Sequence, residues 1–242
     1  MKVSILVPVF NERATVVHAI ARVRAAPITA EIICVDDCSN DGSREILESL
    51  LASGQIDALV SHPTNRGKGA AIRSALEKAT GDVVIIQDAD LEYDPEDIPR
   101  LLGPVHDGRA DAVFGSRFKG DVSRVLYYWH SVGNGALTTL SNMLTNINIS
   151  DMETCYKLVR TDLMKSLPLS SNRFGFEPEI TARLAQSKAR IFEVPISYSG
   201  RTYQEGKKIR WTDGVAAVWH VVKFNLLSKK APVYQPRHDD SR

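Results

Sequence analysis

The N-terminal part of the chain repeats one pattern, in which a short apolar run is followed by a segment with helical periodicity. The apolar runs, rich in β-branched residues, lie at 2–9, 31–35, 57–61 and 83–86. The segments between them place apolar residues on one helical face, as Val16, Ile20 and Val23 do after the first run. Strands that alternate with helices in this way form a parallel sheet with helices on both faces. The sequence therefore predicts an α/β fold with a Rossmann-like, mostly parallel sheet.

The second part of the chain predicts more strands, more helices and a polar tail. Strands are expected at 111–115, 152–159 and 191–198, and helices at 123–147, 177–187 and 211–227. The last helix carries one apolar stripe, formed by Val215, Val218, Trp219, Val222 and Leu226. Such an amphipathic helix either packs on the core or lies in the plane of a membrane interface, which its aromatic and basic flanks also suit. We thus predict a large domain over 1–210, an amphipathic helix over 211–230 and a disordered tail over 231–242.

Composition limits the partners and the compartment. The net charge of +1 gives no general support for nucleic-acid binding, although basic residues gather at 201–230 and suggest a local anion-binding face. The three cysteines form neither a disulfide framework nor a zinc pattern, and their odd number is typical of a reducing, cytoplasmic compartment. The apolar run at 3–10 is too short for a signal peptide. No window of about 18 apolar residues is present, so we expect no membrane-spanning segment.

Three acidic side chains follow the buried run at 83–86. They are Asp88, Asp90 and Glu92, at alternate positions. Alternation on an extended segment would place the three carboxylates on one side, where they repel each other unless a cation neutralises them. Hard oxygen ligands suit Mg²⁺ or Mn²⁺. Because open α/β sheets bind ligands at the carboxyl ends of their strands, the sequence predicts a divalent metal site here.

Further polar residues are expected at the same edge of the sheet. They are Pro8, Asn11 and Glu12 after the first strand, Asp36 and Asp37 after the second, and Asp88 after the fourth. These residues supply acceptors for the ring nitrogens and ribose hydroxyls of a nucleotide. A nucleotide-sugar is the most economical ligand, because a metal at the acidic residues would bridge its diphosphate and stabilise the leaving group.

Other chemistries have weaker support. The segment Arg66-Gly67-Lys68-Gly69 lacks the spacing of a Walker motif, and no dinucleotide-binding fingerprint follows the first strand. Arg66 and Lys68 either contact phosphate or are solvated residues at a helix start. His18, His62, His106, His130 and His220 have no acid or nucleophile at motif spacing, so we interpret them as structural or surface groups.

Five motifs in order carry a resemblance to a known family. They are Val-Pro-Val-Phe-Asn-Glu at 7–12, Val-Asp-Asp-Cys-Ser-Asn-Asp-Gly-Ser at 35–43, Asn-Arg-Gly-Lys-Gly-Ala at 65–70, Gln-Asp-Ala-Asp-Leu-Glu at 87–92 and Gly-Ser-Arg-Phe at 115–118. Together they resemble family 2 glycosyltransferases of the GT-A fold, over about residues 2–210. Within that family the chain is similar to the polyprenyl-phosphate (dolichol-phosphate) mannose synthases. The resemblance implies that 1–210 is a GT-A catalytic domain.

The resemblance also implies a set of site residues. Those expected around the nucleotide-sugar are Pro8, Phe10, Glu12, Val35, Asp37, Asp88, Ala89, Asp90, Arg117, Arg201 and Lys207. Those expected to act in catalysis are Asp88, Asp90, Arg117, Arg201 and Lys207, with Asp88, Asp90 and Glu92 as ligands of Mg²⁺ or Mn²⁺. Glu92 stands where these synthases often have Gln, and residues 204–206 depart from the family's usual sequence, which leaves the sugar open.

The implied activity is an inverting transfer of a hexose to a polyprenyl phosphate, dolichyl or undecaprenyl, with mannose from GDP-mannose as the expected sugar. A lipid phosphate is already an anion at pH 7, so the attack needs cations to hold the reactants rather than a strong general base. The 123–147 and 211–227 segments are candidates for an apolar groove that grips the isoprenoid. We expect peripheral contact with the cytoplasmic face of a membrane, directly or through a membrane-protein partner.

Three alternatives remain open from the sequence. In the first, the donor is UDP-glucose instead of GDP-mannose. In the second, the acceptor is a soluble molecule or a polysaccharide. In the third, the chain is a nucleotide-binding module that has lost catalysis. The Gln-x-x-Arg-Trp motif of processive synthases is not present.

Overall fold

The computed structural model describes residues 1–119, 124, 127–173, 175–201 and 211–236. Its strands are β1 (Val3–Val9), β2 (Ala30–Asp36), β3 (Ala58–Ser61), β4 (Val83–Ile86), β5 (Ala112–Ser116), β6 (Lys157–Arg160) and β7 (Ile191–Pro195). Its helices are α1 (Val16–Ala25), α2 (Ser43–Ala52), α3 (Lys68–Lys78), α4 (Ile98–His106), α5 (Tyr128–Thr145), α6 (Thr161–Ser166), α7 (Phe176–Gln186) and α8 (Trp211–Val222). A 3₁₀ turn, η1 (Pro95–Asp97), precedes α4, and a π-helical turn, η2 (Lys223–Leu227), follows α8.

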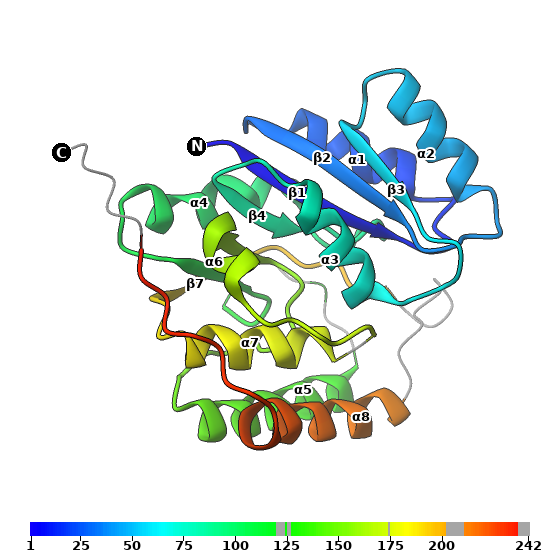
Figure 1. Ribbon diagram of the computed structural model, residues 1–242. Coiled ribbons are helices and arrows are strands. Elements are labelled where there is room, and N and C mark those ends of the chain that lie inside the picture. The colour runs from blue at the N-terminus through cyan, green and yellow to red at the C-terminus, as the bar shows by residue number, and fades with distance from the viewer. Residues whose placement is uncertain (120–123, 125–126, 174, 202–210, 237–242) are drawn as a thin grey trace.

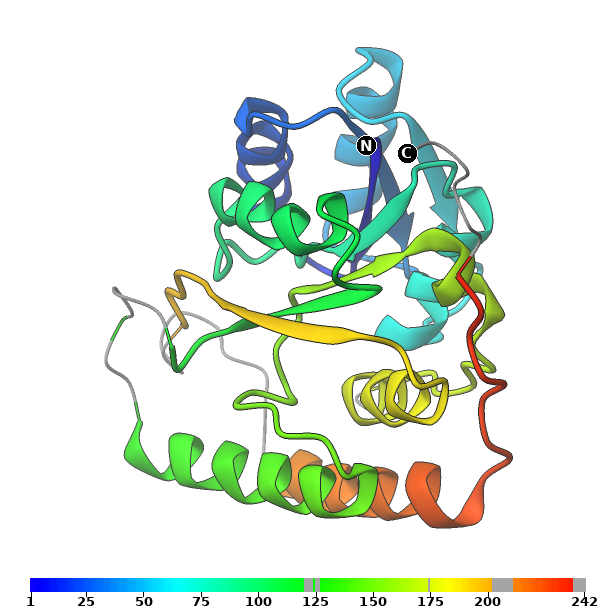
Figure 2. The ribbon, with the colours of Figure 1, turned by 90° about the vertical axis from the view of Figure 1, so that its left-hand side faces the viewer.

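The strands of the described residues form one sheet in the order β3-β2-β1-β4-β6-β5-β7. β3, β2, β1 and β4 are mutually parallel, and β5 is parallel to β7. β6 runs antiparallel to both of its neighbours, β4 and β5. α1 and α4 lie on one side of the sheet, and α3 and α6 lie on the other (Figures 1 and 2). The predicted α/β fold, with a mostly parallel sheet covered on both faces, is confirmed.

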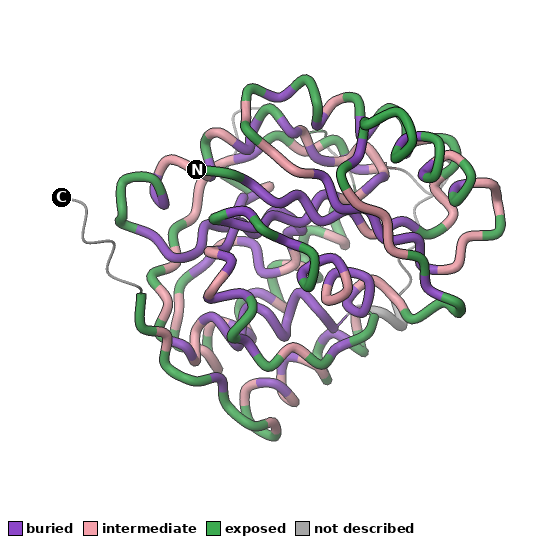
Figure 3. Tube along the Cα trace, turned by 45° about the horizontal axis from the view of Figure 1, so that its top comes forward, coloured by how far each residue is buried: buried purple, intermediate pink, exposed green. Residues whose placement is uncertain are grey.

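The core is centred on β1 and β4. All four residues of β4 are buried, as the β-branched run at 83–86 requires of a strand covered on both faces. Figure 3 shows the buried segments gathered along the sheet and the helices beside it. Because these strands are fixed on every side, the loops at their carboxyl ends start from rigid positions.

Glu31, at the start of β2, joins the amino-terminal ends of the central strands. Its carboxylate accepts hydrogen bonds from Lys2 Nζ at 2.6 Å, from Ser4 Oγ, and from Thr80 N at 2.6 Å. Burial alone would raise the pKa of Glu31, but the bonds from Lys2, Ser4 and Thr80 lower it to about 2.

A Glu31→Gln substitution is therefore expected to cost about 2 kcal/mol of stability at neutral pH. The pKa of Glu31 is lower in the folded state than its ordinary value of 4.5. Its contribution is thus present above pH 4.5 and is lost as the pH falls toward 2. Urea unfolding should show a gap between wild type and E31Q that narrows between neutral pH and about pH 3. A gap that did not depend on pH would contradict this role.

α5 and α8 form an outer layer, side by side beneath α7 (Figures 1 and 2). Ala217, Val221 and Phe224 are buried, whereas Val215 and Trp219 of the predicted apolar stripe are exposed at 63% and 55%. The predicted helix is present, and most of the stripe is exposed, whereas Ala217 and Val221 pack against the protein. Within the described residues, the helices fall short of the length and apolar character that a bilayer crossing requires.

The segment that follows η2 runs back along the body of the protein (Figure 1). Ala231 is buried, and its backbone N–H donates to Gln186 Oε1 at 3.0 Å. The hydroxyl of Tyr234 lies 3.1 Å from the carboxylate of Asp162. The prediction of a disordered tail is thus wrong for 231–236, because the hydrogen bonds of Ala231 and Tyr234 hold this segment on the protein. The polar, proline-containing sequence gives no sign of these two contacts. Residues 237–242 lie outside the described residues.

Candidate functional site

The carboxyl ends of β1, β2 and β4 meet at one edge of the sheet. The register pairs Val9 with Asp36, so the loops that follow β1 and β2 leave the sheet together. These two loops are then joined by backbone donors. The N–H of Asn11 donates to Ser39 Oγ at 3.0 Å, and the N–H of Glu12 donates to Ser43 Oγ at 3.0 Å. The predicted convergence of the strand ends is therefore what the structure shows.

The acidic residues after β4 lie in a turn rather than on an extended segment. The strand ends at Ile86, residues 89 and 90 form the turn, and Leu91 has a φ of 66°. The N–H of Glu92 donates to Asp90 Oδ1 at 3.2 Å within this turn. The expectation that alternation on a strand aligns the three carboxylates is wrong, because the strand stops two residues before Asp88.

Arg201 reaches this acidic turn from the other end of the chain. Its Nη2 lies 2.9 Å from Asp90 Oδ2, its Nε lies 3.3 Å from Glu92 Oε1, and its Nη1 lies 3.7 Å from Glu12 Oε2. The guanidinium thus joins the loop after β1 to the turn after β4. Burial, followed by the charges of Asp88 and Glu92, raises the pKa of Asp90 to about 7 despite this contact.

Lys68, at the start of α3, neutralises the other side of the acidic turn. Its Nζ lies 3.0 Å from Asp88 Oδ1 and 3.0 Å from Glu177 Oε1. Burial opposes the charge, but Asp88, Cys155 and Glu177 raise the pKa of Lys68 well above its ordinary value. The interpretation of Lys68 as a solvated residue at a helix start is therefore wrong, because its ammonium group is paired with two carboxylates.

The carboxylates offer a partial fit to a divalent metal ion. Within the described ranges, no group of three His, Cys, Asp or Glu side chains is arranged as a metal site. Glu92 is engaged elsewhere, since it accepts from Tyr198 OH at 2.7 Å and from the N–H of Arg201 at 3.0 Å. Asp88 and Asp90 are hard oxygen donors whose mutual repulsion a cation would relieve. Asp88 and Asp90 are paired as well, with Lys68 and Arg201, but Glu92 accepts from more donors and is the least available of the three. A site for Mg²⁺ or Mn²⁺ at Asp88 and Asp90 therefore stays a prediction.

Arg117, which follows β5, is held by a buried carboxylate. Its Nε lies 2.7 Å from Asp151 Oδ2, and its Nη2 lies 2.8 Å from Asp151 Oδ1. The guanidinium carbon also lies 5.1 Å from the centre of the Tyr198 ring. Since Tyr198 donates to Glu92, Arg117 belongs to the same cluster as Arg201. Lys207, the third predicted cation, lies outside the described residues.

The predicted nucleotide-contacting residues differ in their access to solvent. Phe10 is 40% exposed, and Pro8 and Glu12 are partly exposed. Val35 and Ala89 are buried, so their side chains belong to the core and leave only their backbone to a ligand.

Asp37 is buried and holds the loop before α3. His62 Nδ1 lies 2.6 Å from Asp37 Oδ1, and the N–H groups of Arg66 and Gly67 donate to the same carboxylate at 2.9 and 2.6 Å. His62 Nε2 in turn lies 2.9 Å from Ser74 Oγ. His62 is therefore a buried structural histidine, which is one of the two roles, structural or surface, that the sequence analysis gave it.

An Asp37→Ala substitution is expected to cost about 3 kcal/mol of stability, because it leaves two backbone donors and a buried imidazole without their acceptor. Loss of nucleotide affinity should follow from the release of the loop. Urea unfolding and calorimetric titration of GDP and UDP measure the two effects. Should D37A keep wild-type stability and lose only nucleotide binding, Asp37 contacts the ligand instead of positioning the loop.

Several residues of this cluster were missed in the sequence. They are Asp151, Glu153, Glu177 and Tyr198. Glu153 is half-buried, and its buried Oε1 has no partner in the described residues. Burial, followed by the charge of Glu177, raises the pKa of Glu153 to about 7. These residues come from segments without a recognised motif, and only the fold brings them beside Lys68 and Arg117.

Comparison with known proteins assigns this architecture. Residues 4–167 match the family model described as Glycosyl transferase family 2. The chain is 31% identical over 237 residues to the low-salt glycan biosynthesis hexosyltransferase Agl6 of Haloferax volcanii, a match that covers 96% of this chain but 54% of that relative. It is 29% identical to the undecaprenyl-phosphate mannosyltransferase of Micrococcus luteus, over 95% of this chain and 96% of the relative. It is 28% identical to the dolichol-phosphate mannosyltransferase of Pyrococcus furiosus, over 86% of this chain and 59% of the relative. The chain thus spans little more than half the length of two of these relatives.

Solved structures confirm the GT-A fold. Glucosyl-3-phosphoglycerate synthase of Mycobacterium tuberculosis in complex with UDP matches with a TM-score of 0.72 and 18% identity, over 94% of this chain and 81% of that chain. The same enzyme with Mn²⁺, UDP and its product matches with a TM-score of 0.68 and 20% identity, over the same shares. At this level of identity the likeness concerns the fold alone.

Proposed function

Because the chain belongs to glycosyltransferase family 2, we propose that it transfers a hexose from a nucleotide-sugar to a polyprenyl phosphate. The observation that carries the proposal is the position of Arg201, which meets Glu12 and Asp90 at the edge where β1 and β4 end. Relatives named as undecaprenyl-phosphate and dolichol-phosphate mannosyltransferases support the acceptor, with GDP-mannose as the proposed donor.

The site residues divide into two roles in this proposal. Asp88 and Asp90 hold Mg²⁺ or Mn²⁺, which supplies positive charge against the diphosphate of the leaving nucleotide. Arg117 and Arg201, with Lys207, hold the phosphate of the acceptor close to the sugar. An anionic phosphate oxygen attacks the anomeric carbon without a strong general base, because it carries no proton to remove.

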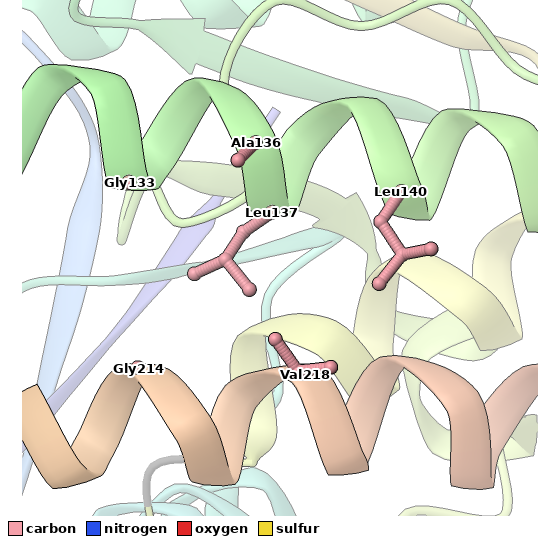
Figure 4. A pocket seen from close by; sticks show the side chains of 6 residues that line it. All are labelled: Gly133, Ala136, Leu137, Leu140, Gly214 and Val218. Carbon is pink, nitrogen blue, oxygen red and sulfur yellow. The ribbon is translucent and has the colours of Figure 1, made fainter.

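The outer helices are the proposed membrane face. α5 and α8 border an apolar pocket of about 350 Å³, lined by Gly133, Ala136, Leu137, Leu140, Gly214 and Val218 (Figure 4). Tyr128 and Trp129, at the start of α5, are exposed at 72% and 77%. We propose that the isoprenoid lies along this pocket and that the aromatic residues rest at the cytoplasmic face of a membrane, alone or with a membrane-protein partner.

A transfer assay with purified protein tests the proposal. GDP-mannose and UDP-glucose are offered separately with undecaprenyl phosphate or dolichyl phosphate in detergent, with Mn²⁺, with Mg²⁺ or with EDTA. We expect mannosyl transfer that EDTA abolishes. Glucosyl transfer would show that the donor is UDP-glucose instead of GDP-mannose. Transfer to a water-soluble acceptor alone would show that the acceptor is not a lipid phosphate. Nucleotide binding without any transfer would contradict the enzymatic proposal.

An Arg201→Ala variant tests the acceptor role. Loss of its charge-assisted hydrogen bonds is expected to lower kcat/KM for the lipid phosphate by about 2 kcal/mol, or about 30-fold. Arg109→Ala is the matched control, because it removes an exposed arginine that pairs with Asp107 before β5, at the opposite end of that strand from Arg117. Wild-type activity of R201A at limiting lipid phosphate would contradict the role.

A further inference from the structure

A second, polar cavity of about 630 Å³ is lined by none of the acidic residues that follow β4. It is bounded by the loop at 170–173, the segment before α3 and the end of α8. The residues that matter for its chemistry are Arg66, Ser171, Arg173, His220 and Lys223. Arg66 lies in the loop that Asp37 holds, and the other four lie outside the proposed donor and acceptor sites.

The charge of this cavity is positive and uncompensated. In the part of the chain that the structure describes, Arg66, Arg173 and Lys223 form no ion pair. Glu179, the carboxylate that acts on His220 from α7, is already engaged. It accepts from the N–H groups of Ser170 and Ser171 at 2.9 and 2.6 Å, and it faces Arg183 at 3.7 Å. Three cations therefore line a space that this carboxylate does not neutralise.

Two polar side chains that line this cavity, His220 and Ser171, pack against Gly175. His220 Nδ1 is buried and has no hydrogen-bond partner among the described residues. A Cβ added at Gly175 would lie 2.6 Å from both His220 Nδ1 and Ser171 Oγ, so the glycine is what lets these two atoms pack against the backbone here. Burial, followed by the charge of Lys223, lowers the pKa of His220, so the ring adds a neutral hydrogen-bonding group beside the cations.

We propose that this cavity binds a phosphate group, and that the phosphate belongs to the headgroup of an anionic lipid. Two guanidinium groups, an ammonium and a hydroxyl are the donors that phosphate recognition uses. The lipid source follows from the neighbours of Lys223 in the chain, because Trp219 and Leu226 are exposed at 55% and 64%. Cations beside exposed apolar and aromatic residues are typical of contact with an anionic membrane surface.

The phosphate site and its source are tested separately. Inorganic phosphate is titrated into histidine-labelled protein, and the imidazole signal of His220 is followed by NMR. Wild type should show a saturable shift, and R173Q/K223Q should bind roughly tenfold more weakly or worse. K229Q/K230Q removes the same charge from lysines outside the cavity and should bind phosphate as wild type does. Equal phosphate binding by wild type and R173Q/K223Q would overturn the site.

Cosedimentation with vesicles tests the lipid. Wild type should bind mixed phosphatidylcholine and phosphatidylglycerol vesicles in preference to phosphatidylcholine alone, and R173Q/K223Q should lose more of this preference than K229Q/K230Q does. Equal loss in the two double variants would show that vesicle binding depends on surface charge in general and not on this cavity, and would overturn the lipid assignment. The lipid part rests on the proposed membrane contact, whereas the phosphate part does not. We expect R173Q/K223Q to keep the melting temperature, the GDP affinity and the transfer activity in detergent of wild type. These three measurements separate failure of this site from failure of the transferase proposal.

Discussion

Replacing Asp90 by Asn is expected to lower hexose transfer by about 100-fold or more while the protein stays folded. The substitution keeps the shape of the side chain and removes one of the two charges that fit a divalent metal. In the metal-free protein the charged form of Asp90 is disfavoured, because burial and the charges of Asp88 and Glu92 raise its pKa to about 7. Loss of that charge should therefore leave the melting temperature of metal-free protein unchanged or higher.

Glu92→Gln is the matched control for Asp90→Asn. Glu92 stands in the same turn, but its carboxylate is held by Tyr198 and Arg201. We expect E92Q to retain activation by Mn²⁺ and the thermal stabilisation that Mn²⁺ gives wild type, and D90N to lose both. Equal loss of Mn²⁺ response in the two variants would restore Glu92 as a ligand. Full activity of D90N would remove the metal from this site.

The sequence predicted that these residues gather at one edge of the sheet, but it did not predict their geometry. Asp88, Asp90 and Glu12 were placed at one edge of the sheet, because parallel strands direct their carboxyl ends the same way. The turn that begins after Ile86 was not predicted, because a positive φ at Leu91 has no signal in a non-glycine residue. The contact between Arg201 and Asp90 joins residues 111 positions apart, and only tertiary structure determines such a pair.

The outer layer shows a second limit of sequence patterns. Periodicity predicted α8 and its apolar stripe through Val215 and Trp219, but it left open whether that stripe packs on the core or faces a membrane. The structure buries Ala217 and Val221 and leaves Val215 and Trp219 exposed. An apolar face on a helix therefore indicates burial against some apolar medium, and the fold decides whether that medium is the protein core.

Removing the side chain of Arg117 is expected to cost both stability and activity. Asp151 is fully buried, and its carboxylate makes two short contacts with this guanidinium. Burial alone would raise the pKa of Asp151, and Arg117 lowers it below its ordinary value. Arg117→Met would leave a buried carboxylate without its charge partner, which is expected to cost about 3 to 5 kcal/mol in urea unfolding.

The double variant R117M/D151N separates the structural role of Arg117 from its proposed role in holding phosphate. The neutral amide that replaces the carboxylate of Asp151 no longer needs a charge partner, so the double variant should recover at least about 2 kcal/mol of the stability that R117M loses. If Arg117 also holds the acceptor phosphate, transfer to the lipid should stay low after stability returns, with kcat/KM for the acceptor reduced about 30-fold or more. Recovery of activity together with stability would show that Arg117 serves only to neutralise Asp151, and the acceptor phosphate would then depend on Arg201 and Lys207 alone.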